Sequence, residues 1–219
     1  MTAVERGNAL SIAYDDILDW IKAFHSTVED NKAYLTKLDS AIGDADHGTN
    51  MARGMNAAIA KIDGLEPGDI GKLLKTVGMA LVGSVGGAGG PLYGTLFMQL
   101  GSVSGGAGEV DLASFADMVD AAVKGVQMRG KAEVGDKTMI DALVPARDTL
   151  KQAASNGTSI VDALAQASEA AERGMESTIP LVARKGRASY LGERSAGHQD
   201  PGATSSYLLV KCASEVLSK

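Results

Sequence analysis

The sequence predicts an all-α protein, an antiparallel bundle of helices joined by short turns. Apolar residues recur at three- and four-residue steps through most of the chain, which is the period of a helix with one buried face. No segment shows the sustained apolar–polar alternation, bounded by turn residues, that indicates a strand. The short connections between helical segments favour antiparallel neighbours in an up-and-down bundle or helical barrel.

Each predicted helix is placed by its own apolar pattern. The first runs from Leu10 to Phe24, and the segments Ile70–Leu81 and Leu112–Val126 repeat its spacing. The remaining helical patterns lie, in chain order, at 30–41, 50–62, 91–103, 138–155, 159–177 and 203–218.

The composition indicates one domain over residues 1–219. With 45% hydrophobic residues the chain is long enough for a substantial core, and no Pro-rich or Ser-rich stretch interrupts it as a linker would. Aromatic residues make up only 4% of the chain and glycines number 27, so small and aliphatic residues must form the core. Helices built in this way can pack closely.

Charge and cysteine usage limit the functions and the compartment. Lys and Arg number 21 against 27 Asp and Glu, a net charge of -6 that argues against binding to nucleic acid. The first residues lack the apolar segment of a secretion signal, and no apolar run is long enough to span a membrane. The single Cys212 allows no internal disulfide. We expect a cytoplasmic protein without a membrane contact, in which phosphate binding needs a metal or backbone groups.

Three aspartates near one turn form the first candidate site. Asp39 stands near the end of a predicted helix, and Asp44 and Asp46 lie on the Gly-flanked turn that follows. Close carboxylates repel one another unless a cation neutralises them, and Mg²⁺ or Ca²⁺ prefers such oxygen ligands. The alternative is an acidic turn in which Asp44 caps the next helix. An EF-hand is a poor match, because Met55 would stand where a bidentate Glu is needed.

A Gly-rich loop and a P-loop-like segment are weaker candidates. The stretch GSVGGAGG at 83–90 precedes a helix that starts near Pro91, so backbone N–H groups and the helix N-terminus could hold an anion; a flexible turn has the same composition. The segment GKAEVGDKT at 130–138 is not a P-loop, because Asp136 displaces Lys137 by one position and a helical pattern precedes it where a strand is required. This segment could still border a ligand.

A long basic loop supplies the positive charge that the rest of the chain lacks. The segment 183–203 is longer than an ordinary connection between helices. Loops of this length are often lids or binding loops. Arginine suits bidentate contacts with phosphate, whereas the simpler interpretation is a solvated loop. Together with the acidic cluster and the Gly-rich loop, a metal–nucleotide site is favoured. The basic residues of the loop are Arg184, Lys185, Arg187 and Arg194.

Four motifs resemble, in order and spacing, those of the L subunits of dihydroxyacetone kinases: LDSAIGDADHGTNM, SVGGAGGPLYGT, RGKAEVGDKTM and ARKGRASYLGERSAGHQDPGATS. The resemblance covers about residues 34–206. It implies an eight-helix up-and-down barrel with ADP or ATP at one end, and two Mg²⁺ ions held by Asp39, Asp44 and Asp46.

The resemblance also implies which residues line the nucleotide. Arg187 is expected to be catalytic, because it could stabilise charge on the transferred phosphoryl group, and the basic loop could close over the site. No residue needs to act as a covalent nucleophile. The implied nucleotide contacts are His47, Gly48, Thr49, Asn50, Ala88, Gly89, Gly130, Met139, Arg187, Asp200, Pro201 and Gly202.

Members of this family are of two kinds. In one, a separate L subunit keeps ADP as a cofactor, takes a phosphoryl group from the histidine of the phosphotransferase-system M subunit, and passes it to dihydroxyacetone on a K subunit. In the other, exchangeable ATP is used, usually in a fusion with the K domain. An end at Lys219 without a K-like domain favours the first kind. A nucleotide-loaded module that signals to a transcriptional regulator, and a magnesium-dependent hydrolase, are further hypotheses.

Overall fold

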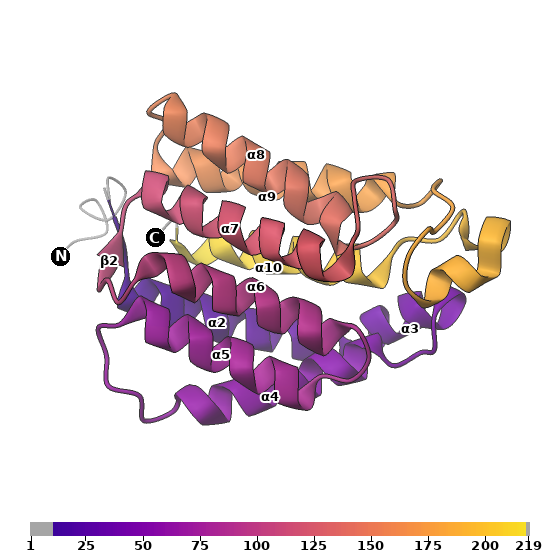
Figure 1. The fold of residues 1–219 in the computed structure, drawn as a ribbon, viewed down its shortest axis with the longest axis horizontal. Helices are drawn as coiled ribbons and strands as arrows, with labels where there is room; N and C mark the ends of the chain where they lie inside the picture. Colours follow the sequence, from indigo (N-terminus) through magenta and orange to yellow (C-terminus); the bar gives the residue numbers. More distant parts are fainter. Residues whose placement is uncertain (1–10, 218–219) are drawn as a thin grey trace.

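The computed structural model describes residues 11–217, and eight long helices dominate this part of the chain (Figure 1). They run up and down along one axis, and consecutive helices are joined at alternating ends. In chain order they are α2 (Tyr14–Asp30), α4 (His47–Ile62), α5 (Ile70–Ser84), α6 (Gly89–Ser104), α7 (Leu112–Gly130), α8 (Met139–Ser155), α9 (Ile160–Ser177) and α10 (Pro201–Leu217).

The eight helices close into a ring. Each packs on the next in the order α2, α4, α5, α6, α7, α8, α9 and α10, and α10 packs back on α2. The shorter α3 (Lys32–Ile42) connects α2 to α4 at one end of the ring (Figure 1). The prediction of an all-α, up-and-down barrel is therefore confirmed.

Side-chain caps fix several helix starts. Asp69, Asp111 and Ser159 each accept a hydrogen bond from the backbone N–H three residues ahead, at the first turns of α5, α7 and α9. Thr138 starts α8 in a capping box, in which the carboxylate of Asp141 accepts from the backbone N–H of Thr138. These caps are local sequence signals, and they explain why these helix starts lie within a residue of the predicted positions.

One apolar core fills the ring and draws on all eight long helices. The ring of Trp20 packs at 6.2 Å from both Phe97 and Phe115, measured between centroids. The helices α5 and α6 approach so closely that a Cβ at Gly78 would stand 2.8 Å from the carbonyl oxygen of Gly94. The predicted close packing through small residues is found at this contact.

The structure differs from the predicted boundaries at several ends. The helix α4 begins at His47 instead of residue 50, and α6 begins at Gly89 instead of residue 91. The segment 183–203, predicted to lack helix, contains the 3₁₀ helix η1 (Arg187–Ser195). The first predicted helix begins at Leu10 and the last ends at residue 218, and both of these residues lie outside the described part of the chain.

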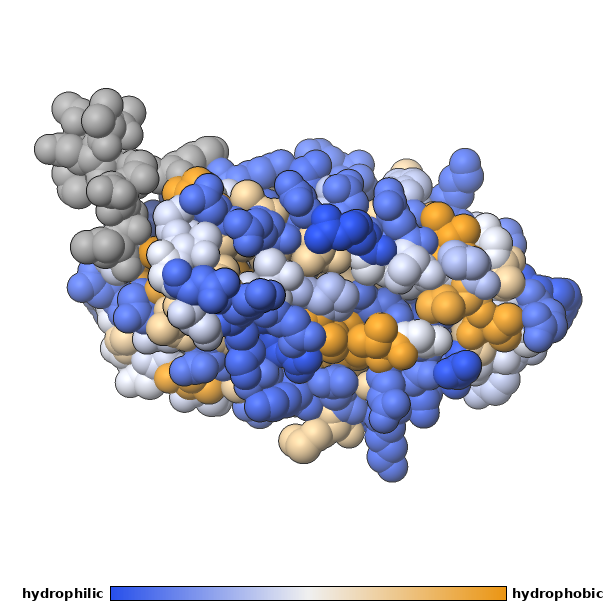
Figure 2. Space-filling model, turned by 90° about the horizontal axis from the view of Figure 1, so that it is seen from above, coloured by the Kyte–Doolittle hydropathy of each residue, from blue (hydrophilic) through white to orange (hydrophobic). Residues whose placement is uncertain are grey.

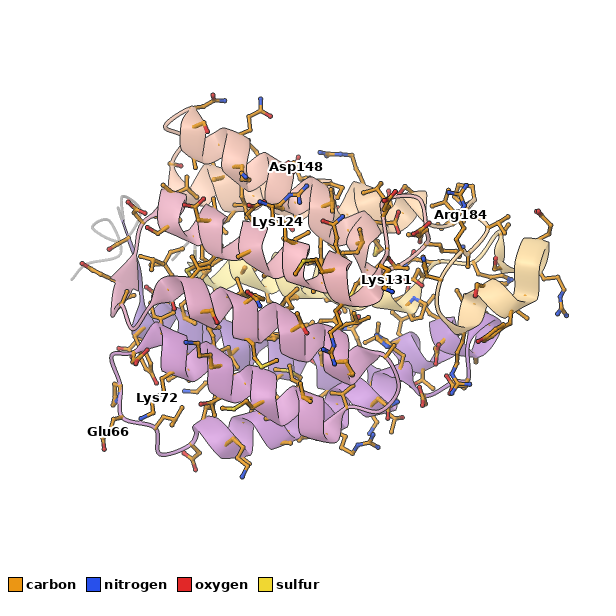
Figure 3. All side chains as sticks on the ribbon, viewed as in Figure 1. Glu66, Lys72, Lys124, Lys131, Asp148 and Arg184 are labelled. Atoms are coloured by element: carbon orange, nitrogen blue, oxygen red, sulfur yellow. The ribbon has the colours of Figure 1, made fainter. Side chains whose placement is uncertain are left out.

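Two very short strands and the loop positions complete the architecture. The strands β1 (Ile12–Ala13) and β2 (Glu109–Val110) pair antiparallel at one end of the ring. At the other end lie the connections α3–α4, α5–α6, α7–α8 and α9–α10 (Figure 1). Lys131 and Arg184 mark this second end in Figure 3, and Glu66 and Lys72 mark the first. Within residues 11–217, no helix has the length and apolar character needed to cross a membrane.

Candidate functional site

The four connections at the second end surround a cavity of about 190 Å³. Its walls come from the α3–α4 turn, the α5–α6 loop, the start of α8, the segment before and within η1, and the start of α10. The stretches that the sequence separates by up to about 160 residues therefore meet in one place. The predicted site residues that line it are Asp39, Asp44, Asp46, His47, Asn50, Ala88, Gly89, Met139, Arg187, Asp200, Pro201 and Gly202.

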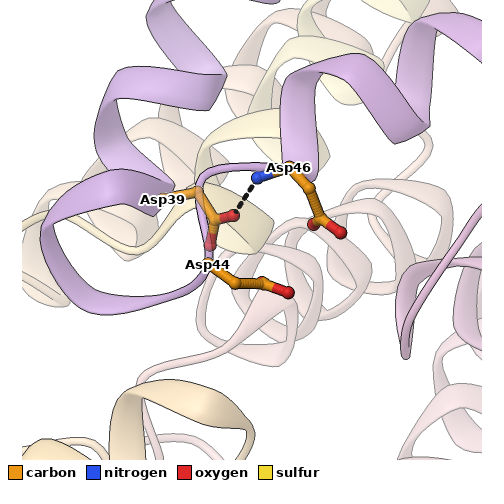
Figure 4. A group of neighbouring side chains, drawn as sticks. All are labelled: Asp39, Asp44 and Asp46. Carbon is orange, nitrogen blue, oxygen red and sulfur yellow. Dashed lines mark hydrogen bonds between the residues drawn. The ribbon is translucent and has the colours of Figure 1, made fainter.

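The three aspartates line this cavity and form a compact oxygen cluster, whose side chains Figure 4 shows. One carboxylate oxygen of each residue lies within 4.8 Å of the others. Asp39 is buried on the last turn of α3, and its Oδ2 accepts hydrogen bonds from the backbone N–H groups of Asp46, at 2.8 Å, and His47, at 3.1 Å. The turn is thereby folded back onto α3, as a shared metal site requires.

Gly43 makes this fold of the turn possible. A Cβ at Gly43 would stand 2.0 Å from Oδ1 of Asp39 and 3.0 Å from its carbonyl oxygen. No side chain fits in that space without displacing the carboxylate. The flanking glycine is therefore part of the geometry of the cluster.

The alternative function of Asp44 as a helix cap is wrong. The N-cap of α4 is Asp46, whose side chain makes no cap hydrogen bond, and Asp39 supplies the accepting oxygen from the preceding helix. The carboxylate of Asp44 instead forms an ion pair with Arg187, with 3.1 Å between Oδ2 and Nε. The two charged loops thus meet in the wall of the cavity.

Arg187 is carried by a small structural unit of its own. The 3₁₀ helix η1 packs against α3 through a minor apolar cluster of Ile42, Ala183 and Ala188, with Leu191 at its edge. This packing fixes the backbone of η1, while the side chain of Arg187 remains 67% exposed. The guanidinium is therefore held near the aspartates with freedom to change partner.

Arg53 orients Asn50 and the Gly-rich loop. Its Nη2 donates to Oδ1 of Asn50 at 2.7 Å, and its Nε donates to the carbonyl oxygen of Ser84 at 2.8 Å. Because a guanidinium only donates, the amide oxygen of Asn50 must face Arg53. A Cβ at Gly86 would stand 3.0 Å from the Asn50 amide, so the loop backbone lies directly on this side chain.

A polar network includes His47 and Tyr93, which both line the cavity. The imidazole Nε2 of His47 is 2.9 Å from the hydroxyl of Ser205, which also bonds the hydroxyl of Tyr93 at 2.7 Å. Burial lowers the pKa of His47, although Asp39 and Asp46 oppose the shift. Burial also raises the pKa of Tyr93 to about 12. A neutral imidazole in this network suits a fixed contact residue.

Asp200 stands at the start of α10 with little exposure to solvent. Its Oδ2 accepts from the backbone N–H of Ala203 at 2.6 Å, and its own N–H donates to Oγ1 of Thr178 at 3.1 Å. Desolvation by burial raises the pKa of Asp200 to about 7, despite these hydrogen bonds and the nearby charge of Lys137. Asp200 is therefore a group that changes charge near neutral pH.

Three residues implied by the resemblance lie outside this cavity. Gly130 lines an adjoining cavity of about 560 Å³, which shares Ala88 and Met139 with the first. Gly48 packs on α3, where a Cβ would meet the carbonyl oxygen of Lys32, and the exposed Thr49 lines an outer groove between α2 and α3. Gly48 and Thr49 could offer the cavity only their backbone groups in the first turn of α4.

Lys137 and Lys185 are not among the nucleotide contacts that the resemblance implies. Both line the first cavity, and Lys185 also lines the second. Lys185 stood in the basic loop, so its charge was a usable signal. Lys137 is buried at 1% exposure, and no pattern of neighbouring residues distinguishes such a lysine from the exposed lysines that loops usually carry.

Comparison with known proteins places these features in a family. Residues 41–215 match the DAK2 domain. The ADP-binding subunit DhaL of the PEP-dependent dihydroxyacetone kinase of Escherichia coli K12 is 45% identical over 196 residues, which are 90% of this chain and 93% of that subunit. The ADP-binding subunit DhaL of the PTS-dependent enzyme of Lactococcus lactis is 36% identical over 94% of this chain and 100% of that subunit.

The fold has a counterpart among solved structures. The dihydroxyacetone kinase of C. freundii in complex with AMP-PNP and Mg²⁺ superimposes with a TM-score of 0.68 and 26% identity, over 90% of this chain and 33% of that longer chain. The DAK2 match over residues 41–215 includes Asp44, Asp46 and the four connections at the cavity end. On its sequence and its fold, the chain belongs to the DAK2 domain family.

Proposed function

We propose that this chain is the nucleotide-carrying subunit of a dihydroxyacetone kinase, with Mg²⁺-bound ADP as a resident cofactor. The observation that carries the proposal is the convergence of three carboxylates, the Gly-rich loop and Arg187 on one cavity. Similarity to two ADP-binding subunits over nine-tenths of the chain supports it.

The donor set fits magnesium. All candidate ligands are carboxylate oxygens, which Mg²⁺ prefers, and Asp39 is already oriented by two backbone N–H groups. Asp44 and Asp46 are less buried and line the cavity, where a metal could also reach phosphate oxygens. We propose two ions held by these three residues, because two divalent cations offset the carboxylates and leave positive charge for the phosphates.

The two adjoining cavities suit the two parts of a nucleotide. The phosphates would lie in the first cavity, near the aspartates, the Gly-rich loop and the N-terminus of α6 at Gly89. The base and ribose would lie in the second, whose lining is largely apolar and includes Leu92, Val126 and Ile140. Gly130 and Met139 would then contact the nucleotide from the α7–α8 side.

The chain's own residues would bind and orient the transferred group. When bound, the magnesium nucleotide supplies a terminal phosphate that accepts and then releases one phosphoryl group. Arg187 could leave Asp44 to stabilise charge on that group, and the loop that carries it would exclude water. His47, Asn50 and Asp200 would hold the nucleotide, because each lines the cavity and is fixed by hydrogen bonds.

The partners proposed for this reaction would dock at the cavity end. The phosphoryl group would come from the phosphohistidine of a phosphotransferase-system M subunit and go to dihydroxyacetone on a K subunit. Figure 2 shows hydrophobic residues on the surface of this end of the molecule. Large exposed apolar side chains there include Met128, Val134, Ile179 and Tyr190. A cytoplasmic location and a transcriptional regulator as a further partner stay predictions.

The experiment that tests this function varies the phosphoryl donor. The chain is combined with a K subunit and dihydroxyacetone, and the phosphorylated ketose is measured with either a phosphorylated M subunit or free ATP as donor. We expect phosphorylated ketose with the phosphorylated M subunit as donor and none with free ATP. The reaction should also require Mg²⁺. Equal turnover with ATP would instead identify a kinase with exchangeable ATP. Magnesium-dependent ATP hydrolysis without a K subunit would identify a hydrolase.

A further inference from the structure

Lys137 carries a buried cation in the α7–α8 connection. Its side chain is 1% exposed, and its backbone lies in the left-handed region at φ 64°. The ammonium Nζ donates to the carbonyl oxygens of Thr178, at 2.6 Å, and Leu181, at 3.1 Å, and it also contacts those of Ile179 and His198. A buried ammonium is costly unless hydrogen bonds satisfy it, and here backbone carbonyls do so.

These carbonyl groups belong to both ends of the α9–α10 connection. Thr178, Ile179 and Leu181 directly follow α9, whereas His198 lies two residues before Asp200, at the start of α10. Residues 182–197, between the two ends, carry Lys185 and Arg187. The ammonium of Lys137 thus joins the two ends of the loop that holds the basic residues of the site.

The acceptors explain why a lysine stands here. Carbonyl oxygens only accept, so the group that joins them must be a donor with several N–H bonds, and an ammonium has three. Burial lowers the pKa of Lys137, while the charges of Asp200 and Asp141 oppose the shift. An apolar side chain would leave the carbonyl oxygens without this partner.

The segment that carries Lys137 is itself held firmly. The carboxylate of Asp141 accepts from the backbone N–H groups of Gly135, at 2.6 Å, and Thr138, at 2.7 Å. The backbone N–H of Arg184 donates to the carbonyl oxygen of Asp136 at 3.1 Å, which adds a second contact between the two connections. Lys137 therefore joins a rigid loop to the longer one.

We propose that Lys137 is a positioning residue that places Arg187 over the aspartate cluster by fixing the ends of the 178–200 loop. The ammonium is engaged by carbonyl groups, so it acts through the loop and not on the phosphoryl group. This proposal rests on the proposed function for its effect on transfer. Its effect on the loop can be measured without any partner subunit.

The test compares Lys137→Met with Lys131→Met, a matched change at an exposed lysine of the same connection. The first readout is tryptic cleavage of the magnesium- and ADP-loaded protein after Arg184, Lys185, Arg187 and Arg194, mapped by mass spectrometry. The second is turnover of dihydroxyacetone with saturating partners, together with the nucleotide content of the protein.

Lys137→Met should speed loop cleavage at least about tenfold and lower turnover about ten- to a hundredfold, because a misplacement of about 1 Å can cost a factor of that size. It should retain its nucleotide, and Lys131→Met should behave like the unaltered protein in both readouts. Unchanged cleavage and unchanged turnover in Lys137→Met would overturn the proposal.

A second variant keeps the proposal testable if Lys137→Met does not fold. Lys137→Gln retains a neutral donor, and hydrogen exchange of residues 182–197 should be faster in it than in the unaltered protein, with lower turnover. Faster exchange with full turnover would overturn the proposal, because loop placement would then not govern transfer. If the unaltered protein turns over no ketose, the proposed function fails, and the cleavage comparison alone decides whether Lys137 fixes the loop.

Discussion

Nε of Arg187 lies 3.1 Å from Oδ2 of Asp44, and both residues line the site cavity. The pair joins the basic loop to the aspartate turn, two segments about 140 residues apart in the sequence. The side chains are 67% and 35% exposed, so solvent screens the attraction and the pair adds little to stability. Its consequence is geometric, because it places a guanidinium beside the proposed position of the phosphates.

Arg187→Ala should retain the bound nucleotide and lose phosphoryl transfer. The aspartates and the Gly-rich loop remain in place, whereas the charge that would stabilise the transferred group is removed. We expect turnover to fall at least about a hundredfold. The matched control is Arg194→Ala, an exposed arginine of the same loop, which should turn over like the unaltered protein. Normal turnover in Arg187→Ala would remove this residue from the mechanism.

Asp44→Ala and Asp46→Ala should each abolish magnesium-dependent nucleotide binding and leave the helical fold largely intact. Both side chains are partly exposed and lie outside the core, so their loss opens no cavity in it. Calorimetric titration with ADP and Mg²⁺ measures the binding, and far-ultraviolet circular dichroism measures the helix content. Retained ADP affinity in either variant would refute the metal clamp.

Gly43→Ala should damage the metal site although it adds only a methyl group. The new Cβ would stand 2.0 Å from Oδ1 of Asp39, so the carboxylate must move away from the backbone N–H groups of Asp46 and His47. The control is Gly83→Ala, where a Cβ on the last turn of α5 meets nothing within 4 Å. We expect ADP affinity to fall at least about tenfold in the first variant, which is about 1.4 kcal/mol of binding free energy, and to stay unchanged in the second. Equal ADP affinity in the two variants would show that the close approach of Gly43 to Asp39 is not needed for nucleotide binding.

Much of this fold follows from the sequence. The apolar periodicity of segments such as Ile70–Leu81 predicts helices whose cores the structure confirms, since three- and four-residue spacing is a local property. The aspartate turn is recognisable because Asp39, Asp44 and Asp46 are close in the chain. The helix start at His47 differs from the prediction, because a contact within the site fixes it: the N–H of His47 donates to the Asp39 carboxylate.

Other features depend on contacts between distant segments. The partner of Asp44 is about 140 residues away, and the four carbonyl groups around Lys137 come from both ends of another connection. Spacing within one segment carries no information about either contact. The helix η1 was also missed, because its packing on α3 through Ala188 depends on the fold, and its own sequence contains a Gly at position 192.

Asp200→Asn should stabilise the protein increasingly as the pH rises. The pKa of Asp200 is about 7 in the folded protein, mainly through desolvation, against an ordinary value of 3.8. The folded state therefore binds the proton more tightly, and ionisation of Asp200 costs stability progressively from about pH 4 to about pH 7. An amide cannot ionise, and it can still accept the hydrogen bond from Ala203.

The measurement is the melting temperature of both proteins in EDTA without nucleotide, from pH 4 to pH 8. The melting temperature of Asp200→Asn should exceed that of the unaltered protein by an amount that grows up to about pH 7 and then stays constant. A difference that does not vary with pH would show that Asp200 is not the titrating group.

The central claim is that the chain holds ADP as a built-in cofactor through magnesium. It is tested most directly by purifying the protein in Mg²⁺ without added nucleotide, dialysing it, denaturing it, and quantifying the released nucleotide by chromatography. We predict stoichiometric ADP that dialysis removes only when EDTA is present. A protein that emerges empty, and that binds and releases ATP freely, would contradict the claim.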